Sequence, residues 1–179
     1  MLHVDAASWM NAMNALILYY SRSGTTRAVA EALAEELGAD IEEIGCGRYP
    51  IGFWGSMKAG YDSWRGKLPL LEPLRHELAR YDMIVIGGPI WMSHPATPVQ
   101  ALLRREEPHI HHTAFFATCG GSAAGPAFAE MQLLAGATPK TTLRIRKAEV
   151  QQADFLPVLS AFARAIRQKP APVADCQIA

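Results

Sequence analysis

Ala15-Leu-Ile-Leu-Tyr-Tyr20, followed directly by Ser21-Arg-Ser-Gly-Thr-Thr26, is the stretch that decides the fold. The first six residues form a short apolar run, which is typical of a strand buried on both faces. The next six are mostly small and hydroxyl-bearing, and they contain one glycine. Apolar residues at helical spacing then run from Thr25 to Leu37, just before the natural C-cap Gly38. A strand, a tight polar loop and a helix in this order predict the first unit of an α/β domain.

The same alternation continues along the chain. Apolar runs predict four more strands at residues 40–44, 83–88, 113–118 and 142–145. Helical spacing predicts four more helices at residues 72–80, 97–105, 126–135 and 153–167. Strands that alternate with helices form parallel sheets through right-handed crossovers. We therefore expect an α/β fold, a three-layer αβα sandwich around five parallel strands.

Length and composition favour one globular domain. A chain of 179 residues, 50% hydrophobic and 19% charged, suits a single domain with a sizeable core. We predict this domain at residues 14–168, between a poorly specified N-terminal leader at 1–13 and a flexible C-terminal tail at 169–179. The 17 basic and 17 acidic residues balance, so no global field attracts nucleic acid.

Cellular location is predicted from two further features. No apolar run approaches the roughly 18 residues of a membrane-spanning helix, which predicts no membrane insertion. The three cysteines are too scattered for a disulfide framework or a zinc site. A reducing cytoplasm is the expected setting.

The loop at residues 21–26 is the first candidate site. Its glycine lets backbone N–H groups converge, its hydroxyls add donors, and a helix N-terminus lies behind them. These features suit a terminal phosphate, with Arg22 as a possible counter-charge. Serine and threonine also cap helices, so a simple helix cap is the alternative interpretation. The loop is neither a P-loop nor a GxGxxG dinucleotide turn.

Two more glycine-containing loops follow predicted strands, GGPIWMSHP at residues 87–95 and TCGGS at residues 118–122. The glycines allow close backbone approach, and Trp91 offers a large flat face or simply packs under a helix. Ligands bind at the C-terminal ends of parallel strands, where strand order reverses. We therefore expect all three loops to surround one crevice.

These motifs resemble those of the flavodoxin-like FMN-binding proteins, including stand-alone bacterial flavodoxin domains. The loop SRSGTT matches the family form [ST]-x-[ST]-G-x-T, and GGPIW is similar to a GxPxW-type loop beside the isoalloxazine ring. The resemblance implies strand order 2-1-3-4-5 and FMN as cofactor. It implies that FMN contacts Ser21, Arg22, Ser23, Gly24, Thr25, Thr26, Pro89, Ile90, Trp91, Met92, Ser93, Thr118, Cys119, Gly120 and Gly121.

The resemblance implies two redox functions. The protein is an electron-transfer module that works with a redox partner protein, or an FMN-dependent oxidoreductase that takes hydride from NAD(P)H and reduces a quinone or another small acceptor. Carrier flavodoxins tend to be strongly acidic, so the neutral charge leans toward the oxidoreductase, whereas the short chain leans toward the carrier. A flavodoxin fold that has lost its flavin is a third possibility, against which the intact SRSGTT loop argues.

Four further features of the sequence have competing interpretations. His94, at the expected flavin rim, is the candidate catalytic residue. Cys119 favours a packing role, because no base partner is evident. The histidine cluster His109-Ile-His-His112 favours a solvated turn over a metal site. The aromatic residues of segment 45–73, Trp54, Tyr61 and Trp64, either cover the flavin or a flat substrate or form the core of that segment.

Overall fold

The computed structural model describes residues 13–46, 68–121 and 123–168. Within these ranges one parallel sheet contains β1 (Ala15–Tyr19), β2 (Asp40–Glu43), β3 (Met83–Trp91), β5 (Thr113–Cys119) and β6 (Thr142–Arg146). Their order is β2-β1-β3-β5-β6, and the two-residue β4 (His94–Pro95) pairs with β3. Since β5 and β6 are the fourth and fifth long strands, this order confirms the predicted 2-1-3-4-5 sheet.

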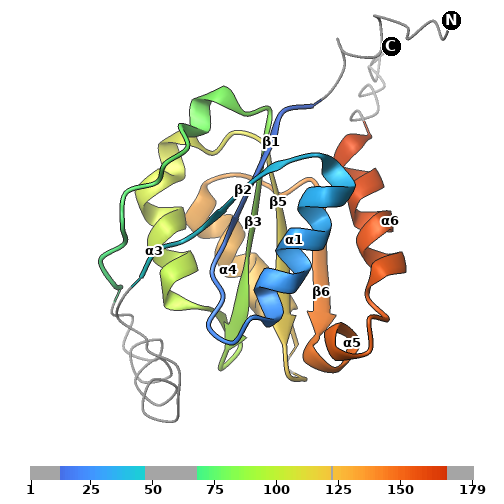
Figure 1. The fold of residues 1–179 in the computed structure, drawn as a ribbon. Coiled ribbons are helices and arrows are strands. Elements are labelled where there is room, and N and C mark those ends of the chain that lie inside the picture. The colour runs from blue at the N-terminus through green and yellow to red at the C-terminus, as the bar shows by residue number, and fades with distance from the viewer. Residues whose placement is uncertain (1–12, 47–67, 122, 169–179) are drawn as a thin grey trace, which may run out of the picture.

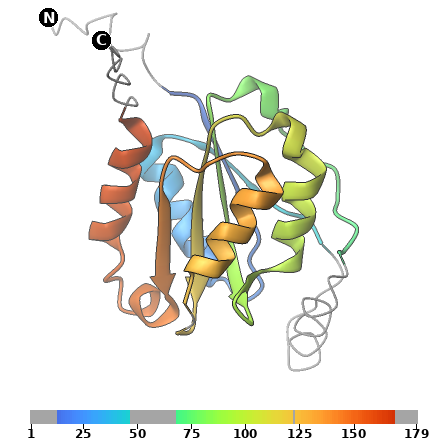
Figure 2. The same cartoon turned by 180° about the vertical axis from the view of Figure 1, so that it is seen from behind.

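Helices cover both faces of the sheet, which confirms the three-layer sandwich. On one face lie α1 (Thr25–Leu37) and α6 (Leu156–Arg167), and on the other lie α3 (Thr97–Glu106) and α4 (Gly125–Ala135), as Figures 1 and 2 show from opposite sides. Side chains of a strand alternate between its faces. Accordingly, Ile17 belongs to the core cluster beside α1 and α6, whereas Leu16 and Leu18 belong to the cluster beside α3 and α4.

The strand register brings the C-terminal strand ends to one edge of the sheet, at the bottom of Figure 1. Tyr19 at the end of β1 pairs with Glu43 on one side and with Gly87 on the other. Further across, Cys119 at the end of β5 pairs with Arg146 at the end of β6. Loops that follow different strands therefore meet at this edge.

The predicted helix at residues 72–80 is wrong. Only the short 3-10 helix η2 (Leu78–Arg80) forms there. Pro73 has no backbone N–H, and the N–H groups of Arg75 and His76 bond to the side chain of Glu42. Because these groups bond to a distant strand, the start of the expected helix does not form.

The carboxylate of Glu42 is buried on the edge strand β2 and holds this returning segment. It accepts hydrogen bonds from the backbone N–H of Arg75 (2.7 Å) and of His76 (3.1 Å), and it lies 2.6 Å from His76 Nδ1. Burial alone raises the pKa of Glu42. The bonds from Arg75 and His76 outweigh that effect, so the pKa lies below its ordinary value of 4.5.

Acid is therefore expected to weaken the fold through Glu42. The unfolded carboxyl has the higher pKa and takes up its proton first, so the contribution of Glu42 is complete above about pH 4.5 and is lost as pH falls through the folded pKa. Glu42→Gln should lower the free energy of unfolding by about 1 to 2 kcal/mol near neutral pH. Urea unfolding at several pH values measures both effects. A constant difference between the two proteins from neutral to acidic pH would contradict this prediction.

The segment after Gly88 is a β-hairpin rather than the expected open loop. Strand β3 continues to Trp91, and β4 returns antiparallel with Ile90 opposite Pro95 and Trp91 opposite His94. Met92 and Ser93 make the turn with φ of 49° and 67°. Such positive φ values at both central residues match the twist that favours two-residue hairpins.

A short helix, α5 (Lys147–Gln151), directly follows β6 and was not expected. The helix predicted at 153–167 begins later, at Leu156, because the chain turns at Ala153 with φ of 57°. The cluster at residues 109–112 precedes the N-terminal end of β5, in part within η3 (Glu107–His109), and Ile110 is buried.

Some expectations fall outside the described residues. These include the leader, the C-terminal tail, Ser122, and Trp54, Tyr61 and Trp64 of the aromatic segment. In the ranges that the structure does describe, no helix combines the length and the apolar character that crossing a bilayer requires.

Candidate functional site

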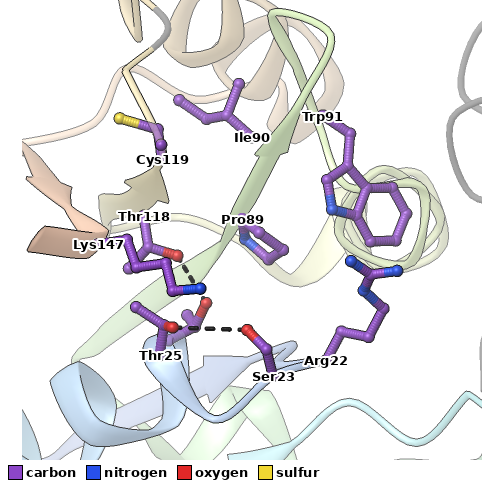
Figure 3. A pocket seen from close by; sticks show the side chains of 11 residues that line it. Arg22, Ser23, Thr25, Pro89, Ile90, Trp91, Thr118, Cys119 and Lys147 are labelled. Carbon is purple, nitrogen blue, oxygen red and sulfur yellow. Dashed lines mark hydrogen bonds between the residues drawn. The ribbon is translucent and has the colours of Figure 1, made fainter. Parts of the chain in front are cut away.

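The three expected loops border one open cavity of about 140 Å³ at the C-terminal edge of the sheet. Ten of the expected residues line it: Arg22, Ser23, Thr25, Thr26, Pro89, Ile90, Trp91, Thr118, Cys119 and Gly120. Figure 3 shows hydroxyl side chains at one end and Trp91 at the other. The cavity thus has a polar end and an aromatic end.

The polar end is built on the N-terminus of α1. Gly24 is the N-cap residue, and its φ of 85° is a left-handed conformation that suits glycine. Within the described ranges no side chain forms a cap hydrogen bond at this helix start, so the hydroxyls of the loop do not serve the alternative role as a helix cap. The first N–H groups of a helix have no partner within the helix and carry partial positive charge. This end of α1 is therefore suited to an anion.

The hydroxyls around this helix end have little else to bind. Ser23 Oγ and Thr25 Oγ1 lie 3.5 Å apart, and neither has a closer hydrogen-bond partner in the part of the chain that the structure describes. Ser21 Oγ is buried and has no partner in the same ranges. A buried polar atom without a partner is rare and costs about 1 to 3 kcal/mol. A ligand with several acceptor oxygens would supply the missing bonds to Ser23 and Thr25, which line the cavity.

Thr26 and Thr118 join the first loop to the end of β5. Both side chains are buried, and their hydroxyl oxygens lie 2.8 Å apart. This bond links the start of α1 to β5, which lies two strands away from β1 in the sheet. Thr26 is therefore bonded within the protein, unlike Ser23 and Thr25. Its bond to Thr118 joins two residues that line the cavity.

The aromatic end is formed by the hairpin of β3 and β4. Pro89, Ile90 and Trp91 are half-buried, and the ring of Trp91 meets that of Tyr20 edge to face, with centroids 5.8 Å apart. The contact with Tyr20 therefore fixes the position of the Trp91 ring. Packing under a helix is not the only contact that Trp91 makes. A flat apolar ring would find matching surfaces here.

Gly87 and Gly88, which lie within β3, serve packing rather than close approach of a ligand. A Cβ at Gly87 would lie 2.0 Å from the ring of Phe116, and a Cβ at Gly88 would lie 2.5 Å from Val99 Cγ2. Both neighbours are buried core side chains. By contrast, Gly120 and Gly121 in the third loop have open space around them.

Two cations line the cavity, and one of them was not expected. Arg22 lies on the Trp91 side in Figure 3, and Lys147 lies on the side of Thr25 and Thr118. Arg27, next to the loop, is committed elsewhere: it bonds to Glu43 Oε2 and to the hydroxyl of Tyr19, and these bonds raise its pKa. The fifth predicted strand ends at residue 145, and the observed strand β6 ends one residue later, at Arg146, directly before Lys147.

Five of the expected residues do not line the cavity: Ser21, Gly24, Met92, Ser93 and Gly121. Met92 is 68% exposed at the hairpin turn. His94 does not line the cavity either, and its Nδ1 lies 2.7 Å from Glu130 Oε2 on α4. This contact ties the hairpin to α4. The catalytic role expected for His94 stays a prediction.

Comparison with known proteins gives fold relatives among solved structures. No protein-family model matches the chain, and no curated protein does. A flavoprotein from Lactobacillus acidophilus, solved in complex with FMN, is similar with a TM-score of 0.68 and 27% identity, over 79% of this chain and 98% of that one.

Two flavodoxins share the fold at lower identity. The two-electron reduced flavodoxin of Megasphaera elsdenii matches with a TM-score of 0.56 and 17% identity, over 87% of this chain and 99% of that one. Oxidised flavodoxin 2 of Bacillus cereus matches with a TM-score of 0.52 and 18% identity, over 86% and 97%. These likenesses confirm the fold expected from the sequence.

Proposed function

We propose that this protein, which has the flavodoxin-like fold, binds FMN in the cavity at the ends of β1, β3 and β5 and acts as a redox protein through it. The observation that carries the proposal is the uncapped N-terminus of α1, beside hydroxyls that have no close partners. Support also comes from the Lactobacillus acidophilus flavoprotein, which was solved with FMN and is 27% identical.

The residues present fit the two ends of FMN. Ser23, Thr25 and the N–H groups behind Gly24 would hold the phosphate, because the two hydroxyls line the cavity and have no closer protein partners among the described residues. Pro89, Ile90 and Trp91 would flank the isoalloxazine ring, with Thr118, Cys119 and Gly120 on the other side. FMN supplies the electron or hydride transfer, while the protein binds and orients it.

The reaction we favour is electron transfer to or from a redox partner protein in the cytoplasm. An NAD(P)H:quinone-type oxidoreductase is the second candidate. The zero formal net charge favours it, since a neutral surface steers a basic partner protein less strongly than an acidic one does.

One experiment tests the cofactor and then separates the two reactions. The visible absorption of FMN is recorded with and without the purified protein, and NADPH and then NADH are added without oxygen. A shifted flavin band establishes binding. Bleaching that needs a separate reductase supports the electron carrier, whereas rapid bleaching by either nucleotide alone supports the oxidoreductase. An unperturbed FMN spectrum at saturating protein would refute the proposal.

Trp91→Ala is expected to weaken FMN binding at least about fivefold, because one aromatic contact contributes about 1 kcal/mol beyond its buried area. The visible band of bound FMN should also move toward that of free FMN. Fluorescence titration and absorption spectra measure both effects, with Trp91→Phe as the matched control that retains a ring. Unchanged affinity and spectrum would show that Trp91 does not border the flavin.

A further inference from the structure

Lys147 stands at the polar end of the cavity but comes from none of the three expected loops. It is the first residue of α5, directly after β6. Its side chain lines the same cavity as Ser23, Thr25 and Thr118. In Figure 3 it points across the cavity toward the hydroxyls of Thr25 and Thr118. A positive charge therefore faces the site that is best suited to a phosphate.

Among the residues that the structure describes, the ammonium of Lys147 makes no ion pair and no hydrogen bond. The nearest carboxylate in sequence, Glu149, is already bound to Arg146: it accepts the Arg146 backbone N–H at 2.7 Å and the Arg146 Nε–H at 2.8 Å. These bonds lower the pKa of Glu149, so it stays ionised and stays with Arg146.

The same contacts position Lys147. The bonds between Arg146 and Glu149 form a capping box at the start of α5. The box fixes where the helix begins, and with it the residue that follows the cap. Lys147 therefore leaves the sheet edge from a defined backbone position, and its ammonium remains available to a ligand.

We propose that Lys147 binds the phosphate of FMN and makes the protein distinguish FMN from riboflavin. This inference rests on the proposed function. A phosphate monoester carries close to two negative charges at neutral pH. Hydroxyls and N–H groups recognise its oxygens, and Lys147 balances part of its charge. Riboflavin has the same ring and ribityl chain but no phosphate, so it gains nothing from Lys147.

Titration of Lys147→Met with FMN and with riboflavin tests the inference. A charge-assisted bond of this kind is lost with the ammonium, so the Kd for FMN should rise about tenfold. The Kd for riboflavin should stay unchanged, and added salt should weaken FMN binding less in the variant than in the unaltered protein. Lys147→Arg should restore most of the FMN affinity. Arg104→Gln, which removes one exposed charge from α3, is the matched control.

The outcomes separate this inference from the proposed function. If the unaltered protein binds neither flavin, the proposed function fails. If it binds FMN, and Lys147→Met binds FMN equally well or loses FMN and riboflavin to the same degree, the role of Lys147 is refuted while FMN binding stands. Loss of FMN affinity alone, restored by arginine, establishes it.

Discussion

A protein carrying both Ser23→Ala and Thr25→Ala is expected to bind FMN at least about 100-fold more weakly than the unaltered protein. Each substitution removes a hydroxyl that has no close protein partner and lies at the uncapped end of α1. A hydrogen bond to a charged group contributes about 1.5 to 3 kcal/mol, so the loss of two predicts about 3 to 6 kcal/mol. Few neighbours depend on these hydroxyls, so the fold should keep its stability.

Quenching of FMN fluorescence measures this affinity, and thermal melting of the protein without FMN measures stability. Ser160→Ala removes a hydroxyl from α6, outside the cavity lining, and serves as the matched control. If the double variant binds FMN as the unaltered protein does, the phosphate does not lie on this loop. If it melts well below the unaltered protein, the hydroxyls support the fold instead of a ligand.

The sheet was predictable because its strands carry their signal locally. Residues 15–19 are all buried, so an unbroken apolar run marks the strand, and the same holds for β5. The resemblance to the flavodoxin-like family implies the strand order. That order predicts the position of the site, because ligands bind at the C-terminal strand ends where the strand order reverses. The sequence therefore predicts that three loops far apart in the chain border one cavity.

The errors arose where distant contacts decide local structure. Apolar spacing at residues 72–80 favours a helix, but the carboxylate of Glu42, 33 residues away from Arg75, takes the N–H groups that a helix would use. Nothing within that window signals the competing acceptor. The hairpin after Gly88 was missed for a related reason, because Met92 and Ser93 are unusual residues at positive φ.

Lys147 shows the limit of motif reading at the site. The family-like motifs lie after the first, third and fourth long strands. No such motif marks the end of the fifth strand, so the motifs do not predict that Lys147 belongs to the site. Yet Arg146 at that end pairs in register with Cys119, which lines the cavity. Topology therefore brings the end of this strand to the cavity, but the exact strand end and the side-chain direction of Lys147 needed the structure.

Gly87→Ala is expected to lower the free energy of unfolding by about 3 kcal/mol, the upper part of the usual cost of overpacking a core. The new methyl group would meet the Phe116 ring at 2.0 Å, and Phe116 is fully buried. Gly87 and Phe116 are register partners on neighbouring strands, so their side chains point to the same face and neither backbone can withdraw alone. The melting temperature should fall by roughly 6 to 12 °C for a domain of this size.

A double-mutant cycle with Phe116→Leu identifies the cause. If the steric clash dominates, the shorter side chain makes room for the methyl group, and Gly87→Ala costs much less in the Phe116→Leu background than alone. If glycine is needed for close approach of a ligand, Gly87→Ala should instead weaken FMN binding while leaving melting unchanged. Gly121→Ala, where no atom lies within 4 Å of the new Cβ, should melt like the unaltered protein. If the two substitutions lower the free energy of unfolding additively, the steric explanation is contradicted. Gly87 would then be required for its backbone conformation and not for the space that it leaves to Phe116.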